Sequence, residues 1–167
     1  MAIYPPLLVF PFAMALAGIM DLITFKIPNW ISTGLAVGFF VSAIASNASW
    51  SFFLVHFGAG LLTLAVGFVM FARGWLGGGD AKLMSAAALW LGFESMPLFL
   101  LWTAMLGGIL AFMLLVYRRT LPPVWLVRHP WAMRLHNPKE GIPYGIALAG
   151  AGLIVFPQTI WMIGVPS

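Results

Sequence analysis

Residues 50–71, WSFFLVHFGAGLLTLAVGFVMF, form an apolar run of the length that a membrane requires. A helix of about 20 residues crosses a bilayer core, which is about 30 Å thick. Comparable runs lie on both sides of this one, at 4–20, 30–45, 81–93, 96–117 and 142–163. The run at 81–93 is short, so this helix is expected to be tilted or to begin inside the protein. The sequence therefore predicts an all-α, polytopic membrane helix bundle with about six transmembrane helices.

The composition agrees with a chain that uses lipid as much of its solvent. Of the 167 residues, 62% are hydrophobic and only 7% are charged, which is too few for the surface of a soluble domain. Six spans use most of the chain, so we expect a single transmembrane domain over residues 1–167. The absence of cysteine excludes disulfides, thiolate metal sites and cysteine nucleophiles.

Basic residues are distributed in a way that predicts the orientation of the bundle. They follow the first run, flank the gap after the third, or lie in the loop at about 118–141. With six alternating spans, all of them fall on one side, which the positive-inside rule predicts to be cytoplasmic, with both termini outside. Topology thus explains the net charge of +4, and no nucleic-acid partner is expected. No basic residue precedes the first run, so we expect a retained helix rather than a cleaved signal peptide.

Two acidic residues at the membrane edge are the candidate chemical centre. Asp21 ends the first run and Asp80 begins the fourth, so the predicted topology places both at a similar depth on the cytoplasmic side. Ionisable groups in such places are costly and usually functional. Two close carboxylates cannot both ionise easily, so one can act as an acid and the other as a base. Two plainer readings stay open: Asp80 caps a helix, or Asp21 pairs with Lys26.

Three glycines, Gly77, Gly78 and Gly79, directly precede Asp80. Glycine adopts backbone conformations that other residues avoid, and it lets another backbone approach closely. We therefore expect an unusual, mobile loop that admits a substrate backbone beside Asp80.

The motifs around both aspartates are similar to those of a known family. Gly77-Gly78-Gly79-Asp80 reads as a GxGD motif, which Lys82 extends to GxGDxK. A second motif, D-x4-K-I-P-N, is formed by Asp21, Lys26, Ile27, Pro28 and Asn29, and a third stretch, Pro143-Tyr144-Gly145, begins the last run. In this order the motifs resemble the type IV prepilin peptidases, which are GxGD intramembrane aspartyl proteases. The short length is similar to the branch that serves Flp-type pili.

The resemblance implies an activity, a substrate and a location. Asp21 and Asp80 would be the catalytic dyad of an endopeptidase that needs no metal or cofactor. Its partners would be prepilins or pseudopilins, whose short basic leaders it removes at the cytoplasmic face of the bacterial inner membrane. Larger relatives also N-methylate the new N-terminus, an activity less expected here without their cysteine-rich domain. The resemblance leaves the oligomeric state and the particular prepilin open.

Supporting residues of these motifs also have plain structural readings. Pro28 and Asn29 suit the start and cap of the second helix. Lys26 and Lys82 are expected to anchor the cytoplasmic face, to tune the dyad or to attract acidic groups. The basic 118–141 loop contains Trp125 and Trp131. Basic and aromatic residues together favour a segment that lies at the membrane interface on anionic headgroups. Substrate docking is the alternative role of this loop.

The histidines and a paired-glycine step complete the candidate features. His129 and His136 lie in the basic loop and His56 lies in the third run, so without thiols a zinc site is not expected. His56 is expected to be a hydrogen-bonded interior residue. Gly34 and Gly38 form a GxxxG step that predicts close packing inside the bundle or, as the alternative, a dimer contact.

Three other function classes remain in view. A proton- or cation-coupled transporter or channel would use the same aspartates, although transporter sites usually lie near the midplane. A non-catalytic scaffold would leave the Asp pair and the glycine run without a purpose. The signal peptide peptidase and presenilin group shares GxGD, but here Met20 precedes Asp21 and Pro-Tyr-Gly replaces its Pro-Ala-Leu.

Overall fold

The computed structural model describes residues 6–122, 126 and 128–163, and helices dominate this part of the chain, which contains no strand. The predicted all-α class is therefore confirmed. In chain order the helices are α1 (Pro6–Thr24), α2 (Asn29–Ala45), α3 (Trp50–Ala72), α4 (Gly78–Arg119), α6 (Pro130–His136), α7 (Tyr144–Val155), η1 (Phe156–Gln158) and α8 (Ile160–Ile163).

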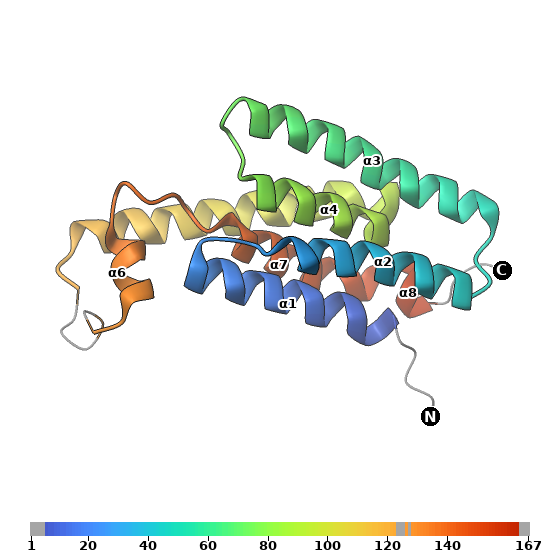
Figure 1. Ribbon diagram of the computed structural model, residues 1–167, viewed down its shortest axis with the longest axis horizontal. Helices are drawn as coiled ribbons and strands as arrows, with labels where there is room; N and C mark the ends of the chain where they lie inside the picture. The colour runs from blue at the N-terminus through green and yellow to red at the C-terminus, as the bar shows by residue number, and fades with distance from the viewer. Residues whose placement is uncertain (1–5, 123–125, 127, 164–167) are drawn as a thin grey trace.

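Helix α4 is broken at Gly92. This glycine has φ 64° and ψ 177°, a conformation that residues with a side chain rarely adopt. At the break the chain doubles back, so α4 supplies two antiparallel helical segments to the bundle (Figure 1). These segments correspond to the predicted runs at 81–93 and 96–117, and the reversal comes two residues before the expected turn at Glu94.

The helices form an elongated antiparallel bundle (Figure 1). Helix α1 begins and α8 ends at the right-hand end in this view. The connections from α1 to α2 and from α3 to α4 lie toward the left-hand end, where α6 also lies. Among the described helices, α3 and α4 are long and apolar enough to cross a membrane, and α1, α2 and α7 are shorter apolar helices. In length and composition these helices are typical of a membrane protein.

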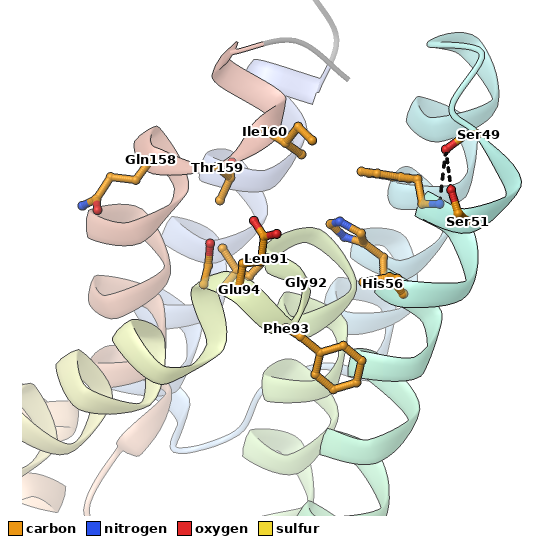
Figure 2. Close-up of a pocket in the computed structure, with 13 residues that line it drawn as sticks. Ser49, Ser51, His56, Leu91, Gly92, Phe93, Glu94, Gln158, Thr159 and Ile160 are labelled. Atoms are coloured by element: carbon orange, nitrogen blue, oxygen red, sulfur yellow. Dashed lines mark hydrogen bonds between the residues drawn. The ribbon is translucent and has the colours of Figure 1, made fainter. Parts of the chain in front are cut away.

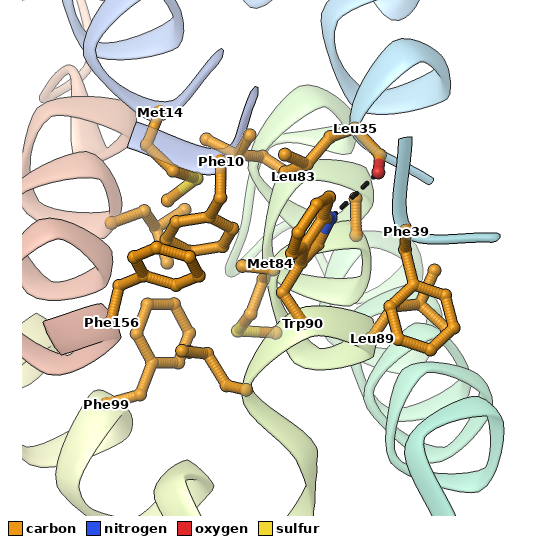
Figure 3. Packing of buried hydrophobic residues seen from close by; sticks show 14 of the residues in the cluster. Phe10, Met14, Leu35, Phe39, Leu83, Met84, Leu89, Trp90, Phe99 and Phe156 are labelled. Carbon is orange, nitrogen blue, oxygen red and sulfur yellow. Dashed lines mark hydrogen bonds between the residues drawn. The ribbon is translucent and has the colours of Figure 1, made fainter. Parts of the chain in front are cut away.

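Aromatic packing fixes α4 against its neighbours. Trp90 is fully buried at the centre of the core, with Phe10 from α1 and Phe39 from α2 beside it (Figure 3). Its indole N–H donates to the Leu35 carbonyl at 2.8 Å, and Trp161 donates in turn to the Trp90 carbonyl at 2.7 Å. Buried indole groups need such partners. This core sets the distance between α1, which carries Asp21, and α4, which carries Asp80.

The GxxxG step of α2 packs in part as predicted. A Cβ added at Gly38 would lie 2.8 Å from the Val9 Cγ1 atom, so this glycine allows α1 to approach closely. A Cβ at Gly34 would meet nothing within 4 Å. Close packing inside the bundle therefore explains Gly38 but not Gly34.

Candidate active site

A cavity of about 320 Å³ lies where α1 ends and α4 begins. Its lining residues are Asp21, Phe25, Lys26, Ile27, Gly77, Gly78, Gly79 and Asp80. Asp21 and Asp80 thus share one cavity although they are far apart in the sequence. The bundle therefore assembles a pair of carboxyl groups of the kind that acid–base chemistry uses.

Asp21 is held by the start of α7. Its side chain is 5% exposed, and Oδ2 accepts a hydrogen bond of 2.7 Å from the Gly145 amide. The first amides of a helix have no partner within the helix, and the positive end of the helix dipole favours an anion there. The N-cap of α7 is Pro143, which is buried and has no amide hydrogen to satisfy. The Pro143-Tyr144-Gly145 stretch is thus brought directly to Asp21.

Gly145 must also be a glycine for steric reasons. A Cβ added there would lie 2.7 Å from Asp21 Oδ2 and 2.8 Å from Ile27 Cδ1. Tyr144 serves a different contact, because its ring packs on Gly107 of α4, where an added Cβ would lie 2.9 Å from the ring. Gly145 therefore joins α7 to α1, and Tyr144 joins α7 to the segment of α4 that follows the break at Gly92.

Asp80 occupies the first turn of α4, and its side chain is half-buried. The N-cap residue of α4 is Gly77, so the predicted N-cap position of Asp80 is wrong. Asp80 still helps to cap the helix, because its carboxylate accepts a hydrogen bond from the Gly77 amide. The carboxylate reaches back over this glycine, since a Cβ at Gly77 would lie 2.7 Å from Asp80 Oδ2. Asp80 therefore lies at the positive end of the α4 dipole.

The glycine run is needed for space rather than for unusual dihedral angles. None of Gly77, Gly78 and Gly79 has a positive φ, which corrects the expectation of unusual dihedrals. A Cβ at Gly79 would lie 3.2 Å from the Ile27 Cβ and 3.5 Å from the Ile27 backbone nitrogen and oxygen. The missing side chain lets the start of α4 approach the α1–α2 connection. This contact brings the two aspartate-bearing segments together.

A hydrogen bond joins the two sequence motifs. Lys82 Nζ donates to Asn29 Oδ1 at 2.9 Å. The N-cap of α2 is Pro28 and no side chain caps this helix, so the predicted capping role of Asn29 is wrong. Asn29 instead begins α2 and binds α4, which gives Lys82 a structural role beside the aspartates.

Lys26 lines the cavity but does not pair with Asp21. Among the described residues, the ion pair within 4 Å joins Arg134 to Glu140, and none joins Asp21 to Lys26. The alternative reading, in which Asp21 and Lys26 form a salt bridge, is therefore wrong. Lys26 is exposed, and its backbone is fixed by the Thr24 hydroxyl, which donates to the Lys26 carbonyl at 2.9 Å.

Sequence reasoning missed Phe25 as a lining residue. Its φ of 55° lies in the left-handed region, which a bulky residue rarely adopts. Nothing in the sequence distinguishes this phenylalanine from the others of the chain except its place four residues after Asp21.

The basic loop contains the short helix α6. Trp131 lies in α6 and is half-buried, whereas Trp125 lies outside the described residues. The Arg118 side chain holds the loop, because it donates to the carbonyl oxygens of Leu135 at 2.9 Å and Glu140 at 2.9 Å. Headgroup contact and substrate docking both remain predictions for this loop.

His56 lies at the opposite end of the bundle from the aspartates. Figure 2 shows it with Glu94 and Thr159 around a second cavity, of about 290 Å³. Its Nδ1 is 2.7 Å from the Leu89 carbonyl oxygen. A carbonyl only accepts, so Nδ1 donates, and the predicted hydrogen-bonded interior histidine is confirmed. The described residues include no group of three His, Asp or Glu side chains placed to hold a metal ion.

Comparison with known proteins bears on the part of the chain that carries both aspartates. The sequence profile of the type IV leader peptidase family matches residues 8–112. This span includes Asp21, Asp80 and the motifs around them, and it ends before the basic loop and Gly145. Neither the curated proteins nor the solved structures provided a match to the chain.

Proposed function

We propose, because the chain belongs to the type IV leader peptidase family, that it is an aspartic endopeptidase whose Asp21 and Asp80 cleave the leader from a prepilin-type substrate. The observation that carries the proposal is the shared cavity, which both carboxyl groups line at the meeting point of α1 and α4. Family membership supports the peptidase activity, and the paired carboxyl groups support the aspartic mechanism.

The proposed reaction uses the two carboxyl groups in complementary protonation states. One carboxylate takes a proton from a water molecule, and the water oxygen attacks the carbonyl carbon of the scissile peptide bond. The other carboxyl group donates its proton to the carbonyl oxygen. Collapse of the tetrahedral intermediate breaks the C–N bond and delivers a proton to the leaving amine. The pair shares one proton, so the titration belongs to both residues together.

The surroundings of Asp21 support a fixed orientation of its carboxyl group. Oδ2 accepts from the Gly145 amide, and the Ile146 amide is a second backbone donor to this carboxyl group. Asp80 lies at a helix start behind three glycines, whose missing side chains let this helix start pack against Ile27 and Phe71 and so hold Asp80 at the cavity. Either residue can act as the base, with the other as the acid.

The distribution of charge supports an active site on the cytoplasmic side of the bacterial inner membrane. Lys26 follows α1, Arg73 follows α3 and Arg118 lies at the end of α4, and these helix ends lie toward the same end of the bundle as α6 (Figure 1). The positive-inside rule makes such an end cytoplasmic. In this arrangement six helical segments cross the bilayer, and both termini are periplasmic.

The substrate is proposed to approach within the membrane. Its apolar segment would lie in lipid beside the bundle, and its leader would reach the cavity at the interface. The motifs favour a prepilin or pseudopilin, for which an Flp-type protein is the first candidate, and the basic face favours contact with anionic headgroups. No metal, cofactor or nucleic acid takes part in the proposed reaction.

A cleavage assay tests the proposal. The chain is co-expressed with an Flp-type prepilin, and the prepilin mass is followed for wild type, Asp21→Asn and Asp80→Asn. We expect wild type to remove the leader and either substitution to reduce cleavage by about a thousandfold or more, because each carboxyl group transfers a proton. Processing that survives both substitutions would rule out the aspartic mechanism.

Glu94→Gln is the matched control. Glu94 is an acidic residue at the opposite end of the bundle, beside the second cavity. Its loss of charge should leave cleavage unchanged at equal membrane levels. If wild type leaves every candidate prepilin intact, proton and ion flux in liposomes becomes the next measurement, since a transporter would use the same aspartates.

A further inference from the structure

The turn after α1 forms one wall of the cavity and is tightly fixed. Phe25, with its left-handed backbone, donates its amide hydrogen to the Asp21 carbonyl at 2.8 Å. The Thr24 hydroxyl donates to the Met20 carbonyl at 2.7 Å and to the Lys26 carbonyl at 2.9 Å. Phe25 is one of the residues that line the cavity that holds both aspartates. A residue that controls this turn therefore controls the shape of the cavity.

Arg134 of α6 contacts the turn from outside the cavity. Its Nη1 donates to the Thr24 carbonyl at 3.3 Å, and its guanidinium carbon lies 4.9 Å from the centre of the Phe25 ring. Its Nε lies 3.8 Å from Glu140 Oε1. A planar guanidinium can lie flat on a ring while its N–H groups donate in the plane of the fork, whereas an ammonium group is a compact point charge without such a plane. Arg134 is not among the residues that line the cavity.

The segment that carries Arg134 is anchored to α4. Arg118 donates from Nε to the Leu135 carbonyl at 2.9 Å and from Nη2 to the Gly141 carbonyl at 3.0 Å. The Tyr117 hydroxyl donates to the Ala132 carbonyl at 3.3 Å. A continuous set of contacts therefore leads from the end of α4 through α6 to Phe25.

We propose that Arg134 is a positioning residue for leader cleavage, which holds the Phe25 ring as an apolar wall against the substrate side chain next to the scissile bond. The inference rests on the proposed function and adds a substrate-binding residue to it. Phe25 makes the contact, and Arg134 acts through Phe25. The family profile ends at residue 112, before α6. The segment that holds this wall therefore lies outside the part of the chain that the profile matches.

Two other roles for Arg134 make different predictions. If its charge alone attracted the substrate, Arg134→Lys would behave as wild type. If it only stabilised the fold, Arg134→Gln would lower the amount of folded protein and leave the kinetics of the folded fraction unchanged. A positioning role requires a change in KM that depends on Phe25.

Steady-state cleavage by the purified full chain separates these roles. We expect Arg134→Gln to raise KM about tenfold with kcat within about threefold of wild type, because the lost interaction is one of binding. Arg134→Lys should show more than half of that rise in KM. Phe25→Ala should raise KM similarly, and the double variant should be no worse than Phe25→Ala alone, because Arg134 acts only through the ring.

Arg128→Gln is the matched control within the same loop. Arg128 is exposed, and it forms no hydrogen bond or ion pair with the described residues. It should show wild-type kinetics. The proposal is overturned if the KM of Arg134→Gln equals that of this control, or if the KM of Arg134→Lys equals that of wild type. It is also overturned if the rises in KM from Arg134→Gln and Phe25→Ala multiply in the double variant.

Hydrogen exchange supplies a readout that does not depend on activity. Peptides that cover residues 22–27 should exchange faster in Arg134→Gln than in wild type, whereas Arg128→Gln should match wild type. Unchanged exchange in Arg134→Gln would overturn the positioning role. A wild-type protein that cleaves no prepilin would overturn the proposed function, and the exchange data would still decide whether Arg134 holds the turn.

Discussion

Asp21 accepts a hydrogen bond of 2.7 Å from the amide of Gly145, a residue 124 positions further along the chain. The contact places a carboxylate from the end of α1 at the start of α7, where helix amides are free to donate. It explains why a Pro-Tyr-Gly stretch that lies far from both aspartates in the sequence belongs to the same site. The backbone of α7 therefore fixes the orientation of the Asp21 carboxyl group.

Gly145→Ala should therefore disrupt the site. The added Cβ would lie 2.7 Å from Asp21 Oδ2 and 2.8 Å from Ile27 Cδ1, so the carboxylate must move. We expect kcat to fall at least about tenfold, because a displacement of a reacting group by about 1 Å is costly. Stability should fall by about 1–3 kcal/mol from crowding. Cleavage rates and thermal unfolding in detergent measure both effects.

Gly108→Ala is the control for that substitution. Gly108 lies within α4, and a Cβ there would meet nothing within 4 Å. Alanine should stabilise the helix by about 0.5–1 kcal/mol and leave kcat unchanged. Equal activity of the Gly145→Ala and Gly108→Ala variants would show that the Gly145 contact does not matter for catalysis.

The hydrogen bond between Lys82 and Asn29 predicts coupling between the two motifs. Lys82→Met and Asn29→Ala should each lower cleavage a few-fold, because each frees the start of α4 from the start of α2. Their effects on stability should be non-additive by about 0.5–1 kcal/mol, a small value because the pair is solvent-exposed. A double-mutant cycle measures this energy, and strict additivity would mean that Lys82 acts on the substrate or the dyad rather than through Asn29.

The sequence predicted the helical class, the approximate helix bounds and the placement of Asp21 and Asp80 at the same end of the bundle, because these follow from local hydropathy and alternation of spans. It did not predict which atoms occupy the space between the helices. The glycine run was assigned unusual dihedrals, whereas the structure requires its small size against Ile27. The space available for a side chain at a helix contact depends on how the whole bundle packs, and the hydropathy of the sequence does not indicate it.

Residues that act through tertiary contacts were also beyond the sequence. Asn29 was expected to cap α2, and only the folded chain shows that its side chain meets Lys82. Arg134 reaches Phe25 across more than a hundred positions, through a loop whose basic charge suggested only a membrane interface. Such pairings depend on the three-dimensional path of α6, which no spacing in the sequence indicates.

The proposed orientation predicts which positions are accessible from outside the cell. The chain has no cysteine, so single introduced cysteines give unambiguous labelling. Gln158→Cys lies at the end of the bundle away from the aspartates, and Lys139→Cys lies in the basic loop; both positions are exposed. A membrane-impermeant maleimide should label the first in intact cells and the second only after permeabilisation. The reverse pattern would place the active site on the periplasmic side.

The break in α4 predicts a strong dependence of stability on Gly92. Its φ of 64° disfavours any side chain, and an added Cβ would lie 2.9 Å from His56 Cε1 and 3.0 Å from Nε2. The imidazole cannot easily withdraw, because its Nδ1 is bound to the Leu89 carbonyl at 2.7 Å. Gly92→Ala should therefore lower the free energy of unfolding by about 2 kcal/mol or more, from backbone strain and crowding together.

A second variant separates those two causes. In the His56→Ala background the crowding is relieved, so the further cost of Gly92→Ala should fall to about 1–2 kcal/mol of backbone strain alone. The dyad lies at the other end of the bundle, so kcat of the folded Gly92→Ala protein should equal that of wild type. Unfolding in detergent and cleavage per folded molecule test both statements. An unchanged cost in the His56→Ala background would assign the whole effect to the backbone, and a lower kcat would mean that the reversal of α4 at Gly92 also determines where Asp80 lies.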